Sequence, residues 1–201
     1  LDTADVVLAT TTGCGDWLLQ DRVFDLVVLD EAAQALEAAS WLPLGLGKRA
    51  VLAGDHCQLP PTVHSEAAAK GGLATTLFER LAASSTGAQM TRMLTTQYRM
   101  HEAIQRWSSA TFYDSRLVPA DLVKAHRLCD LPEVAETEDT SCPLLFLDTA
   151  GCGHDETEGD DDGSKSNPGE AAIAAGHVAR LIEAGVRADQ IAVVTPYSAQ
   201  V

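Results

Sequence analysis

The sequence lacks a hydrophobic run long enough to cross a membrane, and it lacks the marks of a secretory leader. No stretch reaches the ~18 apolar residues of a spanning helix. The first ten residues, LDTADVVLAT, hold two acids and no base, and they lead at once into what looks like a core strand. We therefore expect a cytoplasmic or nuclear protein without a membrane partner, and a chain that is a piece of a longer one.

Paired cysteines are also missing. The five cysteines are widely spaced and no C-x-x-C occurs, which favours reduced thiols over a disulfide framework. His56 and Cys57 with His64, or His126 with Cys129, could be imagined as metal ligands, but they lack the spacings that structural zinc sites prefer. The sequence alone therefore argues against a zinc site.

Basic residues are few, 14 against 29 acids, and the formal net charge of -15 by itself argues against a nucleic-acid partner. Residues 130–162, however, hold twelve of the acids and no Lys or Arg, so the rest of the chain is nearly neutral. We expect residues 154–167 to form a mobile acidic loop. Because like charges repel, deleting this loop should leave the affinity for nucleic acid unchanged or raise it.

The sequence does contain an alternation of short apolar runs and helical patterns. The spacing of apolar residues, with Pro and Gly at the ends, predicts helices over residues 73–83, 101–112 and 168–184. Strands that alternate with helices indicate an α/β fold built on parallel sheet. The runs expected to form buried strands are residues 6–10, 24–30, 49–55, 93–98, 143–149 and 190–197.

A polar link at residues 84–90 separates two α/β blocks. The length of 201 residues suits one large domain or two small ones. We therefore predict two parts, residues 1–90 and 91–201.

An acidic pair ends the second apolar run. In FDLVVLDEAAQ, residues 24–34, a strand delivers Asp30 and Glu31 to the sheet edge where open α/β folds bind ligands. One carboxylate there can hold magnesium while the other orients or deprotonates water, as in sites that hydrolyse nucleotides. Gln34, one turn on, would bind a phosphate or cap the next helix. A solvated acidic turn would give the same short pattern.

The third run leads into GDHCQLPP, residues 54–61. Asp55 ends its strand at the same sheet edge as Asp30, and Gln58 can bridge a terminal phosphate and a neighbouring element. Pro60 and Pro61 make a stiff corner that either wedges against a nucleic-acid base or only ends the run. The loop thus extends the candidate site beyond the acidic pair.

The second block offers Arg99, within TTQYRMH at residues 95–101. An Arg that reaches over from another domain can stabilise charge on a transferring phosphoryl group, and a surface ion pair is the plain alternative. We predict that two neighbouring sheets bring the acidic pair and this guanidinium together across one cleft.

In this order the segments resemble the motifs of superfamily 1 helicases, in the branch of the RNA-surveillance helicases and the immunoglobulin mu-binding helicases. VVLDEAAQ (27–34) resembles motif II, the Walker B box, GDHCQLPP resembles motif III, and LTTQYRMH (94–101) resembles motif IV. VVLATTTG (6–13), SKSNPGEA (164–171) and VVTPYSAQV (193–201) are similar to further boxes of the family. The resemblance covers nearly the whole chain and is closest to the immunoglobulin mu-binding group.

The resemblance implies parts of two RecA-like domains that use ATP and Mg²⁺ to move 5′ to 3′ along single-stranded DNA or RNA, as a monomer. It implies that Asp30 and Glu31 bind Mg²⁺ and activate water, while Gln58 and Arg99 contact the γ-phosphate. The other implied contacts are Gln34, Asp55, Tyr98 and Glu170 at the nucleotide, with Glu170 at the ribose, and Thr10, Thr12, Pro60, Thr195 and Pro196 along the nucleic-acid strand.

The family's phosphate-binding loop is missing from these residues. No G-x-x-x-x-G-K-[ST] occurs, and at the nearest string, Gly47-Lys48, Arg49 follows and Leu42 stands where the first Gly belongs. Without this cradle for the β and γ phosphates, we predict that the 201 residues alone neither bind ATP tightly nor hydrolyse it. The rest of the helicase chain is therefore an expected partner.

Two other readings stay open. The first is a non-catalytic nucleic-acid-binding or scaffold protein that retains a RecA-like shell. The second is a nuclease or another magnesium phosphohydrolase built on Asp30, Glu31 and Asp55, which leaves the QYRM and TPY segments without a role.

Overall fold

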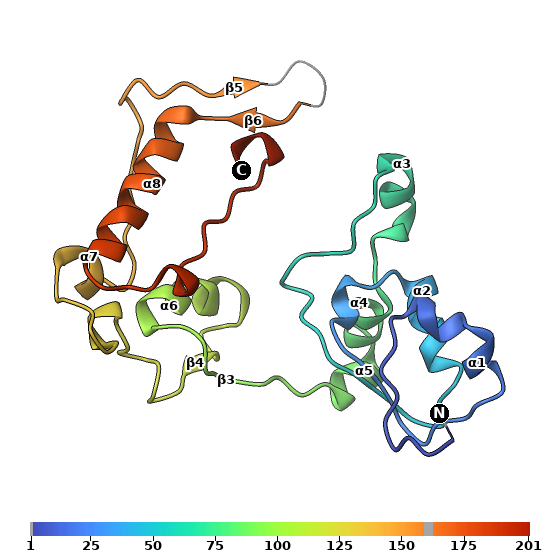
Figure 1. Ribbon diagram of the computed structural model, residues 1–201. Coiled ribbons are helices and arrows are strands. Elements are labelled where there is room, and N and C mark those ends of the chain that lie inside the picture. Colours follow the sequence, from blue (N-terminus) through green and yellow to red (C-terminus); the bar gives the residue numbers. More distant parts are fainter. Residues whose placement is uncertain (1, 159–162) are drawn as a thin grey trace. The chain divides into compact units, whose positions relative to one another are not determined.

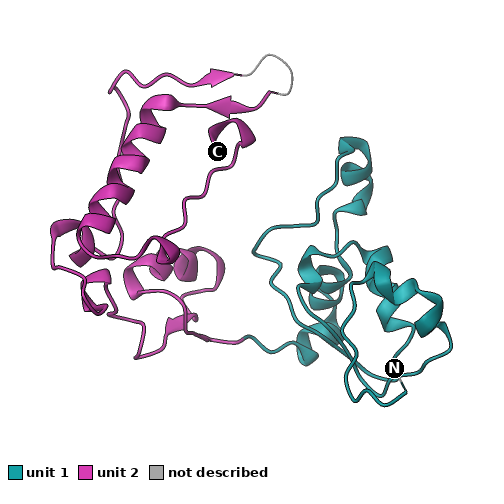
Figure 2. Ribbon diagram, in the orientation of Figure 1, with its two compact units in different colours: residues 1–93 teal, residues 94–201 magenta. Residues whose placement is uncertain are grey.

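The computed structural model describes residues 2–158 and 163–201 and divides into two compact units, residues 1–93 (unit 1) and 94–201 (unit 2) (Figures 1 and 2). Each unit holds one short pair of parallel strands connected through a helix. These small parallel sheets fit the α/β class that the sequence predicts. The division into parts of two RecA-like domains at residues 90 and 91 stays a prediction.

Unit 1 is organised around β1 (Val27–Leu29) and β2 (Ala50–Leu52), which run parallel. An isolated parallel bridge between Phe24 and Gly47 extends their pairing toward the start of the strands. Two of the predicted strands are therefore present, although shorter than expected. The crossover between them passes through α2 (Glu37–Leu44).

The core of unit 1 gathers around α4 (Leu77–Ala82). Leu77 is 1% exposed, and Ala32 and Ala33 from the segment after β1 are also buried. The helix begins later than predicted because the Thr76 hydroxyl caps it, accepting from the Glu79 backbone N–H at 3.1 Å. A cap of this kind stabilises a helix by about 1 kcal/mol.

Residues 84–90, predicted as a polar link between two blocks, are largely helical. These residues form α5 (Ser85–Met90), whose capping residue Ser84 accepts from the Gly87 backbone N–H at 3.0 Å. A Ser at this position lets a short polar sequence start a helix, although its composition is typical of a loop.

Unit 2 contains the parallel pair β3 (Thr96–Gln97) and β4 (Val118–Pro119), connected by α6 (Glu102–Phe112). The helix predicted over residues 101–112 is confirmed, but the side chains that it buries are polar. The buried residues are Gln105 and Ser109, whose side chains both donate to the Leu117 carbonyl, at 3.2 and 2.7 Å. Hydrogen bonds to the loop before β4 decide which face of α6 is covered.

The longest helix, α8 (Pro168–Glu183), confirms the helix predicted over residues 168–184. Asn167 caps its start, and Gly185 follows its end with φ +103°, a conformation that glycine adopts readily. Before it, β5 (Thr157–Glu158) pairs antiparallel with β6 (Lys165–Ser166). The predicted acidic loop is therefore partly a hairpin, and its residues 159–162 lie outside the described residues.

Three of the predicted strands are wrong. Residues 6–10, 143–149 and 190–197 run without a strand assignment in the described part of the chain. Their apolar side chains are largely exposed, at 92% for Leu8, 85% for Phe146 and 90% for Val194. An apolar run becomes a strand only where another strand satisfies its backbone groups, and the described residues offer these segments no such neighbour.

The remaining elements are short. They are η1 (Thr12–Gly15), α1 (Trp17–Gln20), η2 (Ala32–Gln34), α3 (Glu66–Ala68), η3 (Ala69–Leu73), η4 (Leu128–Asp130), α7 (Glu138–Ser141), η5 (Ala188–Gln190) and η6 (Ser198–Gln200). No helix in the described residues has both the length and the apolar character needed to span a bilayer.

Candidate functional site

The segments after β1 and β2 leave the sheet side by side. The Ala53 backbone N–H donates to the Leu29 carbonyl at 2.9 Å, and the Ala32 N–H donates to the Ala53 carbonyl at 2.8 Å. Gly54 lies so near this turn that an added Cβ would stand 2.8 Å from the Ala33 nitrogen. The two loops that carry the predicted acids therefore meet at the carboxyl edge of the strand pair.

Asp30 and Glu31 are both exposed at this edge, and local bonds fix their positions. The Glu31 backbone N–H donates to Asp30 Oδ1 at 3.1 Å, and Glu31 Oε2 accepts from Gln34 Nε2 at 2.9 Å. Glu31 has the left-handed backbone conformation, with φ 52° and ψ 37°, which costs an L-residue about 1–2 kcal/mol. Strain of this kind concentrates at functional sites, where the surrounding structure maintains it.

Asp55 and Gln58 form a second fixed group. Asp55 Oδ1 accepts from the Cys57 backbone N–H at 3.0 Å, and Oδ2 accepts from Gln58 Nε2 at 2.8 Å. Burial, and then the neighbouring charge of Asp55, raise the pKa of the Cys57 thiol. The carboxylate thus orients the exposed amide that the sequence predicts as a phosphate contact.

The chemistry of this edge suits a hard cation. Mg²⁺ prefers oxygen ligands and is usually held by one or two carboxylates together with substrate phosphates. Asp30 and Glu31 offer such oxygens from one loop and Asp55 from the loop beside it. These are the residues of unit 1 that would hold Mg²⁺, with Asp30 the predicted ligand.

In unit 2, Arg99 lies in a turn that follows β3, and the Gln97 side chain holds this turn. Gln97 Oε1 accepts from the backbone N–H groups of Arg99 and Met100, at 2.8 and 2.7 Å, and Gln97 Nε2 donates to the Met100 carbonyl at 2.7 Å. Sequence reasoning missed Gln97, although it lies inside the QYRM motif. Tyr98 is 67% exposed, and the Arg99 guanidinium has no recorded partner among the described residues. That Arg99 faces the acidic pair stays a prediction.

Glu170 lies in the first turn of α8, beside Thr149. Its Oε1 accepts from the Thr149 hydroxyl at 2.7 Å, and both line a shallow depression with Leu147 and Ile173. The depression combines apolar walls with one hydroxyl and one carboxylate, a surface that suits the sugar of a nucleotide. The role of Glu170 at the ribose stays a prediction.

The residues predicted along nucleic acid occupy exposed or half-buried segments. Thr10 accepts from the Gly13 backbone N–H at 3.0 Å, and Thr12 and Pro60 are exposed. In unit 2, Thr195 is half-buried and Pro196 exposed. No described contact tests their role.

A clamp joins the acidic hairpin to the end of the chain. The Ser164 hydroxyl lies 3.1 Å from the Ser198 hydroxyl and accepts from the Ala199 N–H at 2.9 Å, and the Asn167 N–H donates to Gln200 Oε1 at 2.6 Å. The base of the hairpin is therefore held within a few residues of Thr195. The sequence did not predict this contact between the acidic segment and a residue expected along nucleic acid.

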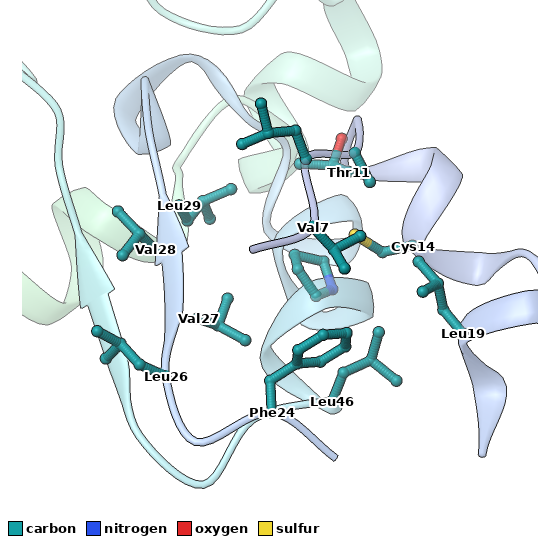
Figure 3. A pocket seen from close by; sticks show the side chains of 13 residues that line it. Val7, Thr11, Cys14, Leu19, Phe24, Leu26, Val27, Val28, Leu29 and Leu46 are labelled. Atoms are coloured by element: carbon teal, nitrogen blue, oxygen red, sulfur yellow. The ribbon is translucent and has the colours of Figure 1, made fainter. Parts of the chain in front are cut away.

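A hollow in unit 1 is a different feature from the acidic edge. Figure 3 shows side chains of the N-terminal segment, β1 and the end of the crossover gathered around it, among them Val7, Leu19, Phe24 and Leu46. Its volume is about 160 Å³, and none of the predicted catalytic residues lines it. Its apolar lining makes it a gap in packing, not a place for phosphate chemistry.

Comparisons with known proteins match nearly the whole chain. Two family models, each described as an AAA domain, match residues 1–66 and 73–201. The chain is 52% identical over 205 residues to the DNA-binding protein SMUBP-2 of Rattus norvegicus, covering all of this chain and 21% of that protein. It is 45% identical to the DNA polymerase alpha-associated DNA helicase A of Schizosaccharomyces pombe over 206 residues, covering all of this chain and 30% of that protein.

A third relative carries a different name. The Regulator of nonsense transcripts 1 homolog of Drosophila melanogaster is 36% identical over 202 residues, covering all of this chain and 16% of that protein. The chain thus spans between about a sixth and a third of the length of these curated relatives.

Proposed function

Because the chain belongs to the AAA-domain family, and within it to the superfamily 1 helicases of the RNA-surveillance branch, we propose that it is the middle of an ATP-driven nucleic-acid motor. It would supply the later part of one RecA-like domain and the earlier part of a second. The complete protein would move 5′ to 3′ on single-stranded DNA or RNA.

The observation that carries this proposal is the shared edge of β1 and β2. Two parallel strands in register end in loops that bear Asp30, Glu31 and Asp55, the arrangement that ligand sites in open α/β sheets use. Bound Mg²⁺ would supply charge neutralisation at the phosphates.

The chain's own residues would act as follows. The Glu31 carboxylate orients water and accepts its proton, with its position set by Gln34. The Gln58 amide, held by Asp55, contacts the terminal phosphate. The Arg99 guanidinium stabilises charge on that phosphate from the second RecA-like part.

Nucleotide and nucleic-acid contacts complete the proposal. Tyr98 and Glu170 would border the base and ribose of ATP. Thr10, Thr12, Pro60, Thr195 and Pro196 would contact the strand through its backbone, which carries no sequence information.

Glu31→Gln in the complete protein tests the proposal. ATP hydrolysis stimulated by single-stranded DNA or RNA should fall about 10²- to 10⁴-fold, because the general base is lost while its size is kept. The matched control is Glu66→Gln, on the exposed helix α3, which should hydrolyse ATP at the wild-type rate. Equal rates for Glu31→Gln and wild type would refute the catalytic assignment.

The isolated chain should show no turnover, since its 201 residues contain no G-x-x-x-x-G-K-[ST] loop. Phosphate release by this polypeptide with single-stranded nucleic acid, abolished by Glu31→Gln, would contradict that expectation. A complete protein that binds nucleic acid but never hydrolyses ATP would favour the alternative of a non-catalytic binding or scaffold protein.

A further inference from the structure

Three different metal-ligating side chains converge in the loop after β2. One ligand atom each from Asp55, His56 and Cys57 lies within 4.8 Å of the other two. We propose that this loop binds a soft or borderline divalent cation, and that Zn²⁺ is the ion of this class that fits it best. The site shares Asp55 with the carboxylates proposed to hold Mg²⁺, but it adds the His56 imidazole and the Cys57 thiol, which are not the oxygen ligands that Mg²⁺ prefers.

The donor set selects the metal. A thiolate, an imidazole nitrogen and a carboxylate oxygen are the three ligand types that zinc takes in proteins. A thiolate is a poor ligand for Mg²⁺ or Ca²⁺, which prefer oxygen. Three protein ligands leave the fourth position of a tetrahedral ion to water, as in open zinc sites.

The loop is held in a shape that presents these atoms. Asp55 is fixed by the Cys57 N–H and the Gln58 amide, yet an ionised carboxylate has about four lone-pair sites and can bind an ion as well. The His56 ring lies beside the Phe78 ring of α4, with centroids 6.3 Å apart. His56 is exposed and Cys57 half-buried, so an ion can enter from solvent.

The sequence argued against His56 and Cys57 as ligands together with His64, because they lack the spacings of structural zinc motifs. Those spacings describe ligands brought together from separate turns. Here a single tight turn brings neighbouring side chains together.

The test is titration of the purified chain with Cd²⁺, read by the ultraviolet absorption of the cadmium–thiolate bond, and with Zn²⁺, read by competition with a chromophoric chelator. Cys57→Ser should remove one cadmium–thiolate site and weaken zinc binding at least about tenfold, since even groups that only orient ligands change affinity 10- to 100-fold. Cys152→Ser, which removes an exposed thiol of unit 2, should leave that site unchanged.

His56→Ala and Asp55→Asn distinguish metal binding by all three side chains from binding by the Cys57 thiol alone. Each keeps Cys57 and should weaken Cd²⁺ and Zn²⁺ binding at this position, whereas His126→Ala should not. If Cys57→Ser changes nothing, or if it alone removes binding while His56→Ala and Asp55→Asn bind as tightly as wild type, the proposal fails. Circular dichroism of each variant shows whether the fold is retained, and neither readout depends on ATP hydrolysis.

Discussion

The two units hold their predicted catalytic groups in different ways. In unit 1, the side chains of Glu31 and Asp55 are both bonded to amides three residues further on, Gln34 and Gln58. In unit 2, Gln97 fixes the backbone of Arg99, but the guanidinium has no recorded partner among the described residues. The side chains of the acids are held by residues close in sequence, whereas for the arginine the described residues hold only the backbone and not the side chain.

This difference has an energetic meaning. Holding a long Arg side chain in one place costs up to about 2 kcal/mol of rotamer entropy, which its binding partner must offset. A short carboxylate that is already hydrogen-bonded loses much less rotamer entropy when a ligand binds. We therefore expect unit 1 to be nearly ready for its ligand, and the arginine of unit 2 to become ordered only when charge is present.

The sharpest test of this comparison is Arg99→Ala in the complete protein. An arginine that acts only on the transferring phosphoryl group contributes about 10³- to 10⁵-fold to the rate, so kcat for ATP should fall by that factor. Arg106→Ala, on an exposed position of α6, is the matched control and should keep the wild-type rate. A wild-type rate for Arg99→Ala would show that Arg99, like Arg106, does not act on the phosphoryl group, and the proposed role of unit 2 would be wrong.

The next effect concerns the close approach of the two loops in unit 1. In Gly54→Ala, the new Cβ would stand 2.8 Å from the Ala33 nitrogen and 3.2 Å from the Ala32 nitrogen, both backbone atoms that cannot give way cheaply. The free energy of unfolding should fall by about 1–3 kcal/mol, measured by urea denaturation.

Gly71→Ala is the control for that measurement, because nothing lies within 4 Å of a Cβ at position 71. Its stability should be unchanged or slightly higher. Equal stability of the two variants would mean that the loops of β1 and β2 are not in fixed contact.

The smallest effect is the acid dependence of two ion pairs, one in each unit. The hydrogen bond from Arg80 lowers the pKa of Glu37 in unit 1, and the hydrogen bond from Arg180 lowers the pKa of Asp139 in unit 2. A carboxylate whose pKa is lowered by folding stabilises the protein above its ordinary pKa, and this contribution is lost as the pH falls through the lowered value.

The thermal midpoint of wild type should therefore decrease as the pH falls below 4.5, the ordinary value for Glu37. Glu37→Gln should lose part of that slope, and so should Asp139→Asn. The change should be small because both pairs are partly exposed. Slopes identical to wild type in both variants would show that neither pair contributes to stability.

The sequence predicted local features better than long-range ones. The helix over residues 168–184 was predictable because its Asn cap, early Pro and final Gly all lie within the segment itself. The strand predicted at residues 143–149 is wrong, because a strand depends on a neighbour that the run itself does not encode.

The candidate site divides in the same way. The positions of Asp30, Glu31 and Asp55 at one edge followed from apolar runs that end in acids, and the paired strands β1 and β2 carry them. Gln97 and Thr149 were missed because their roles depend on the atoms that they contact. Gln97 bonds to the turn at Arg99, and Thr149 bonds to the carboxylate of Glu170. The sequence argued against His56 and Cys57 as metal ligands because the geometry of the proposed set with Asp55 comes from a turn and not from spacing.

The left-handed backbone of Glu31 has a consequence for anyone who engineers this protein for heat resistance. Glycine at that position would remove a penalty of about 1–2 kcal/mol and would be enriched in a screen that selects only for survival at high temperature. The variants that such a screen enriches would be more stable and would have lost the carboxylate. Under the proposed function these variants would also lose ATP hydrolysis, so a useful selection has to score both stability and activity.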